Sequence, residues 1–284
     1  MHEQVLNKEL TGAFDNSYNK RLSFSFKPNF FKLLVFILSI INIGFILLIV
    51  FSLFYNSSVS NILAVLSNIT VWQAVRISFS SIVISALITI LIGTAVAYII
   101  SQKDNKTNRI ISILLNVPLL MPPAVAGLAL LMTFGRRGFL ANLLSNFTIS
   151  FSFFALIIVQ VFVMLPLFTQ SLKNSFQVIA NQDIQEAAMI AGAGDKDLLL
   201  YIYLPLSRRP FFTGLTMACL RAAGEFGATL LFAGNLEGRT QTLSTAIYTF
   251  IQQDINLAVS LAVLMLVLFL IPLFIIELSR AEKN

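Results

Sequence analysis

Charged side chains are scarce in this chain. Asp, Glu, Lys and Arg make up 11% of its 284 residues, whereas ordinary soluble domains carry roughly 25%. So few charges cannot cover a water-exposed surface. Together with the 57% hydrophobic content, this deficit predicts an all-α polytopic membrane protein folded as a helix bundle.

Cysteine and histidine are rarer still, with one residue of each. Cys219 lies in an apolar run, so no intrachain disulfide can form and a small packing residue is expected. His2 stands in a polar tail and cannot make a metal site by itself. No cluster of His, Cys or carboxylates indicates a membrane enzyme. We therefore expect no catalytic residue, metal or cofactor on this chain.

Six apolar stretches are long enough to cross about 30 Å of hydrocarbon as helices, at about 1.5 Å per residue. They are Leu33–Phe54, Ile77–Ile100, Ile110–Phe134, Phe151–Phe168, Phe211–Phe232 and Leu257–Ile276. The first is too long and too far from the N-terminus for a cleavable signal, so it is expected to remain as an anchor. The predicted organisation is a tail, residues 1–30, and one transmembrane domain, residues 31–280.

Basic residues are concentrated on one side of these spans. Of the 19 Lys and Arg residues, 14 lie in the N-terminal tail, the second and fourth loops and the C-terminus, and four lie on the opposite side. Cytoplasmic loops accumulate Lys and Arg, so both termini are predicted to be cytoplasmic. The basic residues form no dense run with interleaved aromatic residues, and we expect no nucleic-acid partner.

The fourth loop, residues 169–210, is the longest connection between spans. Asp183, followed three residues later by Glu186, is typical of a capped helix start. A narrow stripe of mostly small apolar side chains would follow on one face. It consists of Ile184, Ala187, Ala188 and Ala191. Such a helix is too weakly apolar to insert in lipid, but it is suited to dock in a groove of another protein. The alternative is a mere connector.

The second half of this loop contains residues that stop helices. Gly192 and Gly194 can end the first helix in a left-handed conformation, and Asp195 can cap a second helical turn. Pro205 and Pro210 would then stop the segment before the fifth span. The expected structure is a short helical hairpin on the cytoplasmic face.

This hairpin resembles the EAA signature, EAA-x3-G-x9-I-x-LP, of ATP-binding-cassette importer permeases. All seven fixed positions are matched, by Glu186, Ala187, Ala188, Gly192, Ile202, Leu204 and Pro205. The resemblance implies coupling helices that sit in a cleft of a separate ATPase subunit. It also implies two permease and two ATPase subunits, of which a permease homodimer is the simplest form. Because the chain has no G-x-x-x-x-G-K-[ST] motif, ATP and Mg²⁺ are expected on the partner.

Helix breakers occur inside the third predicted span. Pro118, Pro122 and Pro123, with Gly127, interrupt helical hydrogen bonding, which is tolerated where neighbours or a cavity satisfy the freed carbonyls. A kinked helix that lines a pore is one interpretation. A lipid-facing kink that only shapes the bundle is the other.

One ion pair is predicted inside the fifth span. Arg221 and Glu225 are four residues apart and fall near the membrane midplane. A charge at that depth costs at least about 2.5 kcal/mol, so the pair should neutralise itself or face a polar cavity. A structural pair and direct solute contact both remain open.

Glycines and small polar residues surround this pair. With backbone amides and hydroxyls they could face a solute pathway, or they could serve tight helix packing. The candidate pathway residues are Pro122, Pro123, Arg221, Gly224, Glu225, Gly227, Thr229, Thr240 and Thr242.

The runs 224–229 and 238–243, with 121–123 and 135–139, resemble molybdate permeases of the molybdate, tungstate and sulfate importer group. The resemblance covers residues 118–277. Phe226 and Ala228 stand where sulfate permeases tend to have Tyr and Ser, so molybdate is ranked above sulfate; a sulfate or tungstate permease of the same group is the alternative. The resemblance implies that an external binding protein delivers an oxyanion to the permease. The oxyanion would then be imported across the cytoplasmic membrane of a prokaryote by alternating access.

An ion-gradient secondary transporter is the competing class. Such proteins need coupling-ion sites near the midplane. Glu225 is the sole acidic candidate within the predicted spans.

Overall fold

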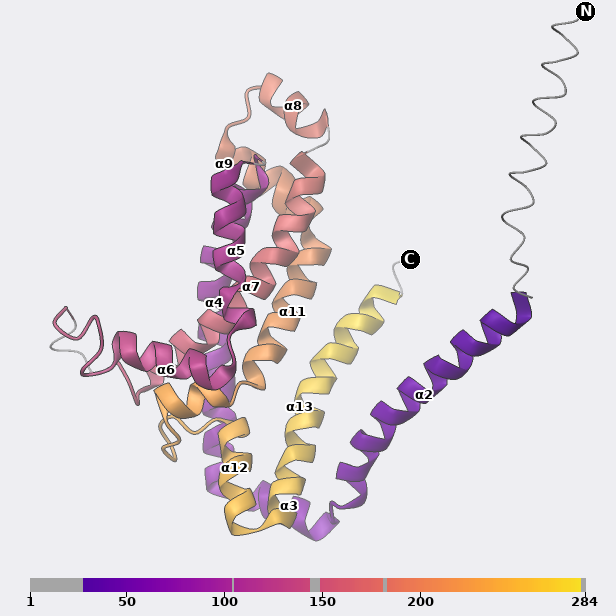
Figure 1. The fold of residues 1–284 in the computed structure, drawn as a ribbon, viewed down its shortest axis with the longest axis vertical. Helices are drawn as coiled ribbons and strands as arrows, with labels where there is room; N and C mark the ends of the chain where they lie inside the picture. Colours follow the sequence, from indigo (N-terminus) through magenta and orange to yellow (C-terminus); the bar gives the residue numbers. More distant parts are fainter. Residues whose placement is uncertain (1–27, 104, 144–148, 181–182, 282–284) are drawn as a thin grey trace, which may run out of the picture. The chain divides into compact units, whose positions relative to one another are not determined.

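The computed structural model describes residues 28–103, 105–143, 149–180 and 183–281, and every secondary-structure element in these ranges is helical (Figure 1). The all-α prediction is therefore confirmed. The chain divides into two compact units, residues 1–55 and 56–284, and each is described by itself. Most of the predicted tail lies outside the described residues.

The first unit contributes one described helix, α2 (Pro28–Tyr55). It matches the first predicted span. Its part Phe30–Tyr55 is long and apolar enough to cross a membrane.

The second unit contains the remaining helices. Before the fourth loop these are α3 (Val59–Ser67), α4 (Ile69–Ser101), α5 (Lys106–Leu120), α6 (Pro123–Phe134) and α7 (Phe153–Ala180). The loop contributes α8 (Asp183–Ile190), α9 (Asp195–Asp197), the π-helical η1 (Leu198–Tyr203) and α10 (Leu204–Leu206). After it come α11 (Arg208–Ala223), the π-helical η2 (Thr229–Ala233), α12 (Leu243–Gln253) and α13 (Ile255–Ala281).

Not all six predicted spans are continuous helices. In the described ranges, three unbroken helices are long and apolar enough to cross a membrane: Phe30–Tyr55, Ile69–Ser101 and Phe153–Ala180. The pair α5 and α6 makes a fourth if it is counted as one span. The sixth predicted span coincides with α13, of which Ile255–Ile271 is a shorter apolar helix.

The third predicted span is bent by 111° between α5 and α6. Met121 has an extended backbone conformation and Pro122 is non-helical, with φ of −54° and ψ of 138°, because the residue before a proline avoids the helical region. Pro123 then begins α6, where a proline's missing N–H costs nothing. Pro118 remains inside α5. The expected kink is thus confirmed, and it lies at 121–122.

The fifth predicted span, Phe211–Phe232, is wrong as a continuous helix. Helix α11 ends at Ala223, and Glu225 and Phe226 are not helical before the chain resumes towards η2. Gly224 at the helix end has no β-carbon to favour continuation. The helix can break here because the side chains of Glu225 and Ser244 form hydrogen bonds with backbone groups near the break.

Helices α4, α7 and α11 form a hydrophobic core at the end of this unit that carries the fourth loop. Their buried members include Ala97, Met164, Phe168, Leu172, Phe176, Ala218 and Ala222, together with Leu198 and Tyr203 of η1. Helix α4 also presents a stripe of buried serines and threonines to its neighbours. Gln160 of α7 bonds to two of them, donating to Ser81 Oγ at 2.9 Å and accepting from Ser85 Oγ at 3.0 Å. Such polar contacts hold helices together where hydrocarbon offers no hydrophobic driving force.

Candidate functional site

The fourth loop forms a helical hairpin, as the sequence predicts. Helix α8 begins at Asp183 itself, so any residue capping it lies at 181–182, outside the described residues. Gly192 has φ of +91°, the left-handed conformation that ends a helix. Gly194 has φ of −85°, so its expected left-handed conformation is wrong. It caps α9 instead.

The cap of α9 also differs from the prediction. Asp195 is the first residue of α9, and the carboxylate of Asp197 accepts the N–H of Gly194 at 3.1 Å. A carboxylate three residues along the chain can satisfy that donor because the first turn of a helix leaves its N–H groups free. Asp195 is thereby free for another contact, with Tyr98 of α4.

Most of the small apolar stripe on α8 faces outwards. Ile184, Ala187 and Ala191 are exposed, whereas Ala188 is half-buried against the α4, α7 and α11 core. Glu186 is also exposed. Large apolar side chains elsewhere on α8, η1 and α10 are exposed as well: Met189, Ile190, Leu200, Tyr201 and Leu206. An exposed apolar patch of this kind marks an interaction surface.

Further signature residues hold the hairpin to the bundle. Ile202 and Leu204 are half-buried and pack on the core, and Pro205 is exposed. Between them, Tyr203 is fully buried, edge-to-face with Phe176 at a centroid distance of 5.1 Å. Burial raises the pKa of the Tyr203 hydroxyl, which therefore stays a protonated donor at neutral pH.

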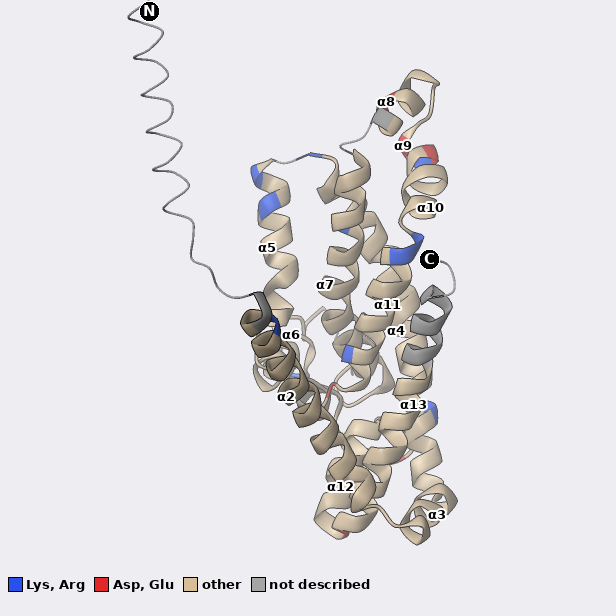
Figure 2. Cartoon of the chain, turned by 90° about the vertical axis from the view of Figure 1, so that its right-hand side faces the viewer, with Lys and Arg blue, Asp and Glu red and all other residues tan. Residues whose placement is uncertain are grey.

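The end of this unit that carries the hairpin is also its basic end. Figure 2 shows Lys and Arg at the start of α5, on α9 and at the start of α11, towards the same end of this unit as α8. Lys103, Lys106, Lys196, Arg208 and Arg209 are exposed. The hairpin and the positive charge predicted to be cytoplasmic thus lie together.

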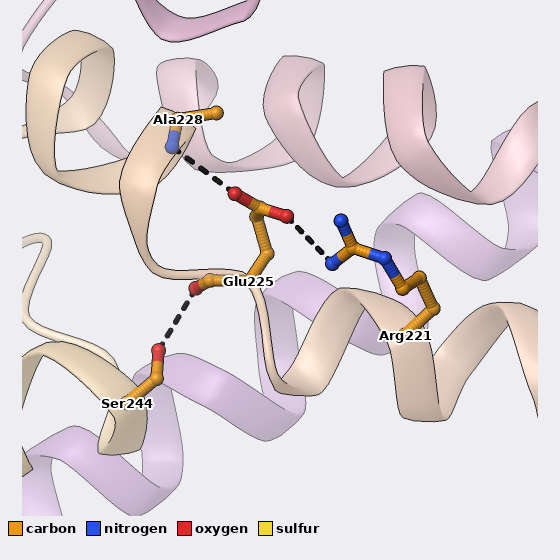
Figure 3. Close-up of polar contacts among 4 residues, drawn as sticks. All are labelled: Arg221, Glu225, Ala228 and Ser244. Carbon is orange, nitrogen blue, oxygen red and sulfur yellow. Dashed lines mark hydrogen bonds and ion pairs between the residues drawn. The ribbon is translucent and has the colours of Figure 1, made fainter. Parts of the chain in front are cut away.

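The break between α11 and η2 is built around Glu225. Its carboxylate accepts Arg221 Nη1 at 2.6 Å through one oxygen and the backbone N–H of Ala228 at 3.0 Å through the other (Figure 3). Ser244, from the first turn of α12, donates to the Glu225 carbonyl at 2.9 Å. These bonds satisfy backbone groups that the interrupted helix leaves free, which an apolar environment demands.

The two members of the pair differ in exposure. The Glu225 side chain is 2% exposed, whereas that of Arg221 is 42% exposed. Both carboxylate oxygens of Glu225 are thus used at the break, whereas the partly exposed guanidinium of Arg221 has further N–H donors besides the one that bonds Glu225.

The two broken spans meet at reciprocal glycines. A β-carbon on Gly127 of α6 would lie 2.8 Å from the Ala228 Cα, and one on Gly227 would lie 2.8 Å from the Pro123 Cβ. Side chains do not fit in either place, so the backbones approach closely. This contact joins the 121–122 bend to the 224–226 break.

Gly127→Ala is expected to destabilise the protein by about 1–3 kcal/mol, the usual cost of forcing a methyl group into a packed contact. Gly44→Ala in α2 is the matched control, since no atom lies within 4 Å of its added β-carbon. Thermal unfolding of the detergent-extracted variants measures the difference. Equal melting temperatures for the two variants would contradict the close contact.

The remaining pathway candidates divide by exposure. Pro122, Pro123 and Gly224 are exposed, whereas Thr229, Thr240 and Thr242 are buried. Thr240 Oγ1 accepts the N–H of Leu236 at 3.1 Å, and Thr242 caps α12. Both hydroxyls therefore have structural roles in the described conformation. Arg221, Gly224 and Glu225 do lie together at the break, and Gly227 is the candidate that meets a proline of the α5 and α6 bend, Pro123.

Sequence reasoning missed several residues of these two regions. Ser244 bonds to the Glu225 backbone, and Gln185, Tyr98 and Tyr203 bond within the hairpin and to it. A serine or glutamine outside a signature carries no local signal for such long-range contacts. The run 243–253, which lies between the fifth and sixth predicted spans, forms α12, and Thr242 before it is a residue type that typically caps a helix start.

The known proteins that this chain resembles are membrane components of transport systems. Residues 89–279 match the family model described as "Binding-protein-dependent transport system inner membrane component". A probable transport system permease protein, NifC of Clostridium pasteurianum, is 36% identical over 73% of each chain. The putative molybdenum transport system permease protein YvgM of Bacillus subtilis is 35% identical over 64% of this chain and 81% of its own length.

A third relative and a solved structure extend the comparison. The molybdenum transport system permease protein ModB of Escherichia coli is 30% identical over 64% of this chain and 80% of its own. A chain of a bacterial alginate ABC transporter, solved in complex with an alginate-bound periplasmic protein, superposes with a TM-score of 0.69 at 14% identity. The superposition covers 93% of this chain and 99% of the transporter chain, so the two chains share a fold.

Proposed function

We propose that this chain carries molybdate across the cytoplasmic membrane. The chain belongs to the family of binding-protein-dependent transport system inner membrane components, which are the permeases of ATP-binding-cassette importers. The observation that carries the transport mechanism is the complete EAA signature on an exposed hairpin at the basic end of the bundle. The solute rests on relatives named as molybdenum permeases at 30–35% identity.

The hairpin is the ATPase-docking element in this proposal. Glu186, Ala187, Ala188 and Gly192 present a small-faced helix to a cleft of the separate ATPase, which binds ATP and Mg²⁺. Ile202 and Leu204 hold the second half of the hairpin to the bundle, and Pro205 lies exposed on the same segment. Positive residues collect on the cytoplasmic side of membrane proteins, so the hairpin and both termini are assigned to that side.

The solute route in this proposal passes the junction of the two broken spans. Pro122, Pro123, Arg221, Gly224 and Gly227 lie there, and the half-exposed guanidinium offers a positive charge that is already compensated. Thr229, Thr240 and Thr242 support this region from buried positions. A dianion can move past an arginine whose charge is balanced by Glu225, and past neutral amide and hydroxyl donors, without being held there permanently.

The assembly follows from the same premise. Two copies of this permease with two ATPase subunits form the transporter, and an external binding protein delivers the solute. ATP binding closes the ATPases and turns the pathway outwards, and hydrolysis resets it. Each ligand state thus favours a different conformation.

An ion-gradient mechanism finds little support in the geometry. Glu225, the acidic residue expected to hold a coupling ion in such a transporter, already uses both carboxylate oxygens, one for Arg221 and one for Ala228. A coupling ion would have to displace these partners.

Competition experiments test the solute. Uptake of labelled molybdate by cells that express the transporter with its ATPase and binding protein is expected to fall when unlabelled molybdate or tungstate is added, and to fall less with sulfate. The three dianions share charge and shape and differ mainly in size. Sulfate as the strongest competitor would reassign the chain to the sulfate permeases.

A further inference from the structure

The cytoplasmic end of α4 is bonded to both halves of the coupling hairpin, although α4 is not adjacent to the hairpin in sequence. Tyr98 donates its hydroxyl to Asp195 Oδ1 of α9 at 3.2 Å. Four residues later, Gln102 accepts Gln185 Nε2 of α8 at 3.1 Å. One helix end therefore holds the first and second arms of the hairpin.

Tyr203 joins these two contacts into one cluster. Its hydroxyl donates to Gln185 Oε1 at 2.7 Å, and its ring meets Tyr98 edge-to-face at 5.3 Å and 89°. The side chain is fully buried. Gln185 thus uses its amide oxygen for the hairpin's own η1 and its amide nitrogen for α4. We call Tyr98, Gln102, Gln185, Asp195 and Tyr203 the loop clamp.

Closer to its N-terminus, at Ser78, α4 contacts the segment that supports the break at Glu225. Ser78 Oγ accepts the N–H of Leu243 at 2.9 Å, and the next residue, Ser244, bonds to the Glu225 carbonyl at 2.9 Å. From Ser78 to Tyr98 a continuous helix spans about 30 Å at about 1.5 Å per residue. Helix α4 therefore contacts the hairpin at its C-terminal end and, at Ser78, the segment that supports the break.

We infer that the loop clamp transmits the movement of the docked hairpin to α4, and through α4 to the break at Glu225. This inference rests on the proposed function. The hairpin is joined by the chain itself to α7 and α11, and the clamp adds α4 as a third, non-covalent connection. Tyr98, Gln102, Gln185 and Tyr203 are positioning residues in this account, and none of them needs to touch the ATPase or the solute.

A specific coupling defect is the expected signature of losing the clamp. Tyr203→Phe keeps both edge-to-face ring contacts and removes only the hydroxyl. Hydrolysis of ATP should continue, while the number of oxyanions imported per ATP falls about fivefold, the factor that corresponds to about 1 kcal/mol for one lost hydrogen bond. Tyr55→Phe in α2 is the matched control, because it deletes an exposed tyrosine hydroxyl outside the clamp.

Reconstituted transporter with its ATPase and binding protein allows both quantities to be measured on one sample, with labelled molybdate uptake and phosphate release as readouts. Gln185→Leu should reproduce the defect. Gln185→Leu removes the bond to Gln102 as well, so its defect should be at least as large as that of Tyr203→Phe. The double variant should be no worse than Gln185→Leu alone, since the bond that Tyr203→Phe removes is already lost there.

Two results separate the possibilities. An unchanged ratio of uptake to hydrolysis in Tyr203→Phe would overturn the clamp, even if both rates fell equally. A hydroxyl that only stabilises the loop would reduce the amount of working transporter and leave that ratio intact. A wild-type transporter without ATP-driven uptake would overturn the proposed function and the clamp with it.

Discussion

Glu225→Ala is expected to abolish uptake and to destabilise the protein by about 3 kcal/mol. Breaking a buried ion pair by removing one partner costs about 3–5 kcal/mol because the other charge is left uncompensated. The lower figure applies because the Arg221 side chain is 42% exposed. The N–H of Ala228 also loses its acceptor, so the segment leading into η2 should lose its fixed position next to α6.

A matched set of variants isolates the pair. Glu237→Ala removes an exposed carboxylate from the same part of the chain and should be neutral. Replacing both partners, Arg221→Met with Glu225→Gln, should recover much of the stability, since no charge is left unpaired and a glutamine oxygen can still accept the Ala228 N–H. Thermal unfolding and uptake of the four proteins decide it. A stable, active Glu225→Ala protein would show that the break does not depend on this residue.

Gly192→Leu is expected to leave the protein inserted in the membrane and to prevent ATPase docking. No atom lies within 4 Å of a β-carbon built at Gly192, so the fold has room for a side chain. The φ of +91° adds about 1–2 kcal/mol of local strain for a residue with a β-carbon. The added side chain would project where the ATPase cleft is expected to receive α8. Uptake should fall more than about tenfold, equivalent to about 1.4 kcal/mol of docking free energy.

Gly192→Asn separates strain from obstruction. Asparagine adopts the left-handed conformation more readily than other residues with a β-carbon, and its side chain is short. We expect it to retain more ATPase on co-purification than Gly192→Leu. Full complex formation and uptake in the leucine variant would contradict the assignment of α8 as the docking helix.

Local chemistry explains which parts of the fold could be predicted. Long apolar runs, the prolines at 122 and 123 and the glycine at 192 act through their immediate neighbours in sequence, so the helices, the bend and the left-handed hairpin residue were all within reach. The expectation for Gly194 was wrong because a carboxylate three residues later, Asp197, offered its N–H a different partner.

Contacts between distant segments account for what could not be predicted. The fifth predicted span looks continuous, because Arg221 and Glu225 at i and i+4 suit an unbroken helix. The break instead depends on Ser244, 19 residues beyond Glu225, and on the fit of Gly127 against Ala228. Tyr203 likewise occupies a variable position of the signature, yet its hydroxyl bonds Gln185 on another helix.

The most direct test of the central claim is ATP-dependent uptake by purified components. Liposomes would contain this permease and its ATPase, with ATP enclosed and the binding protein with labelled molybdate outside. The account predicts uptake that requires enclosed ATP and the binding protein and that persists when ion gradients are collapsed. Uptake that proceeds without ATP and stops when the gradients are collapsed would contradict it.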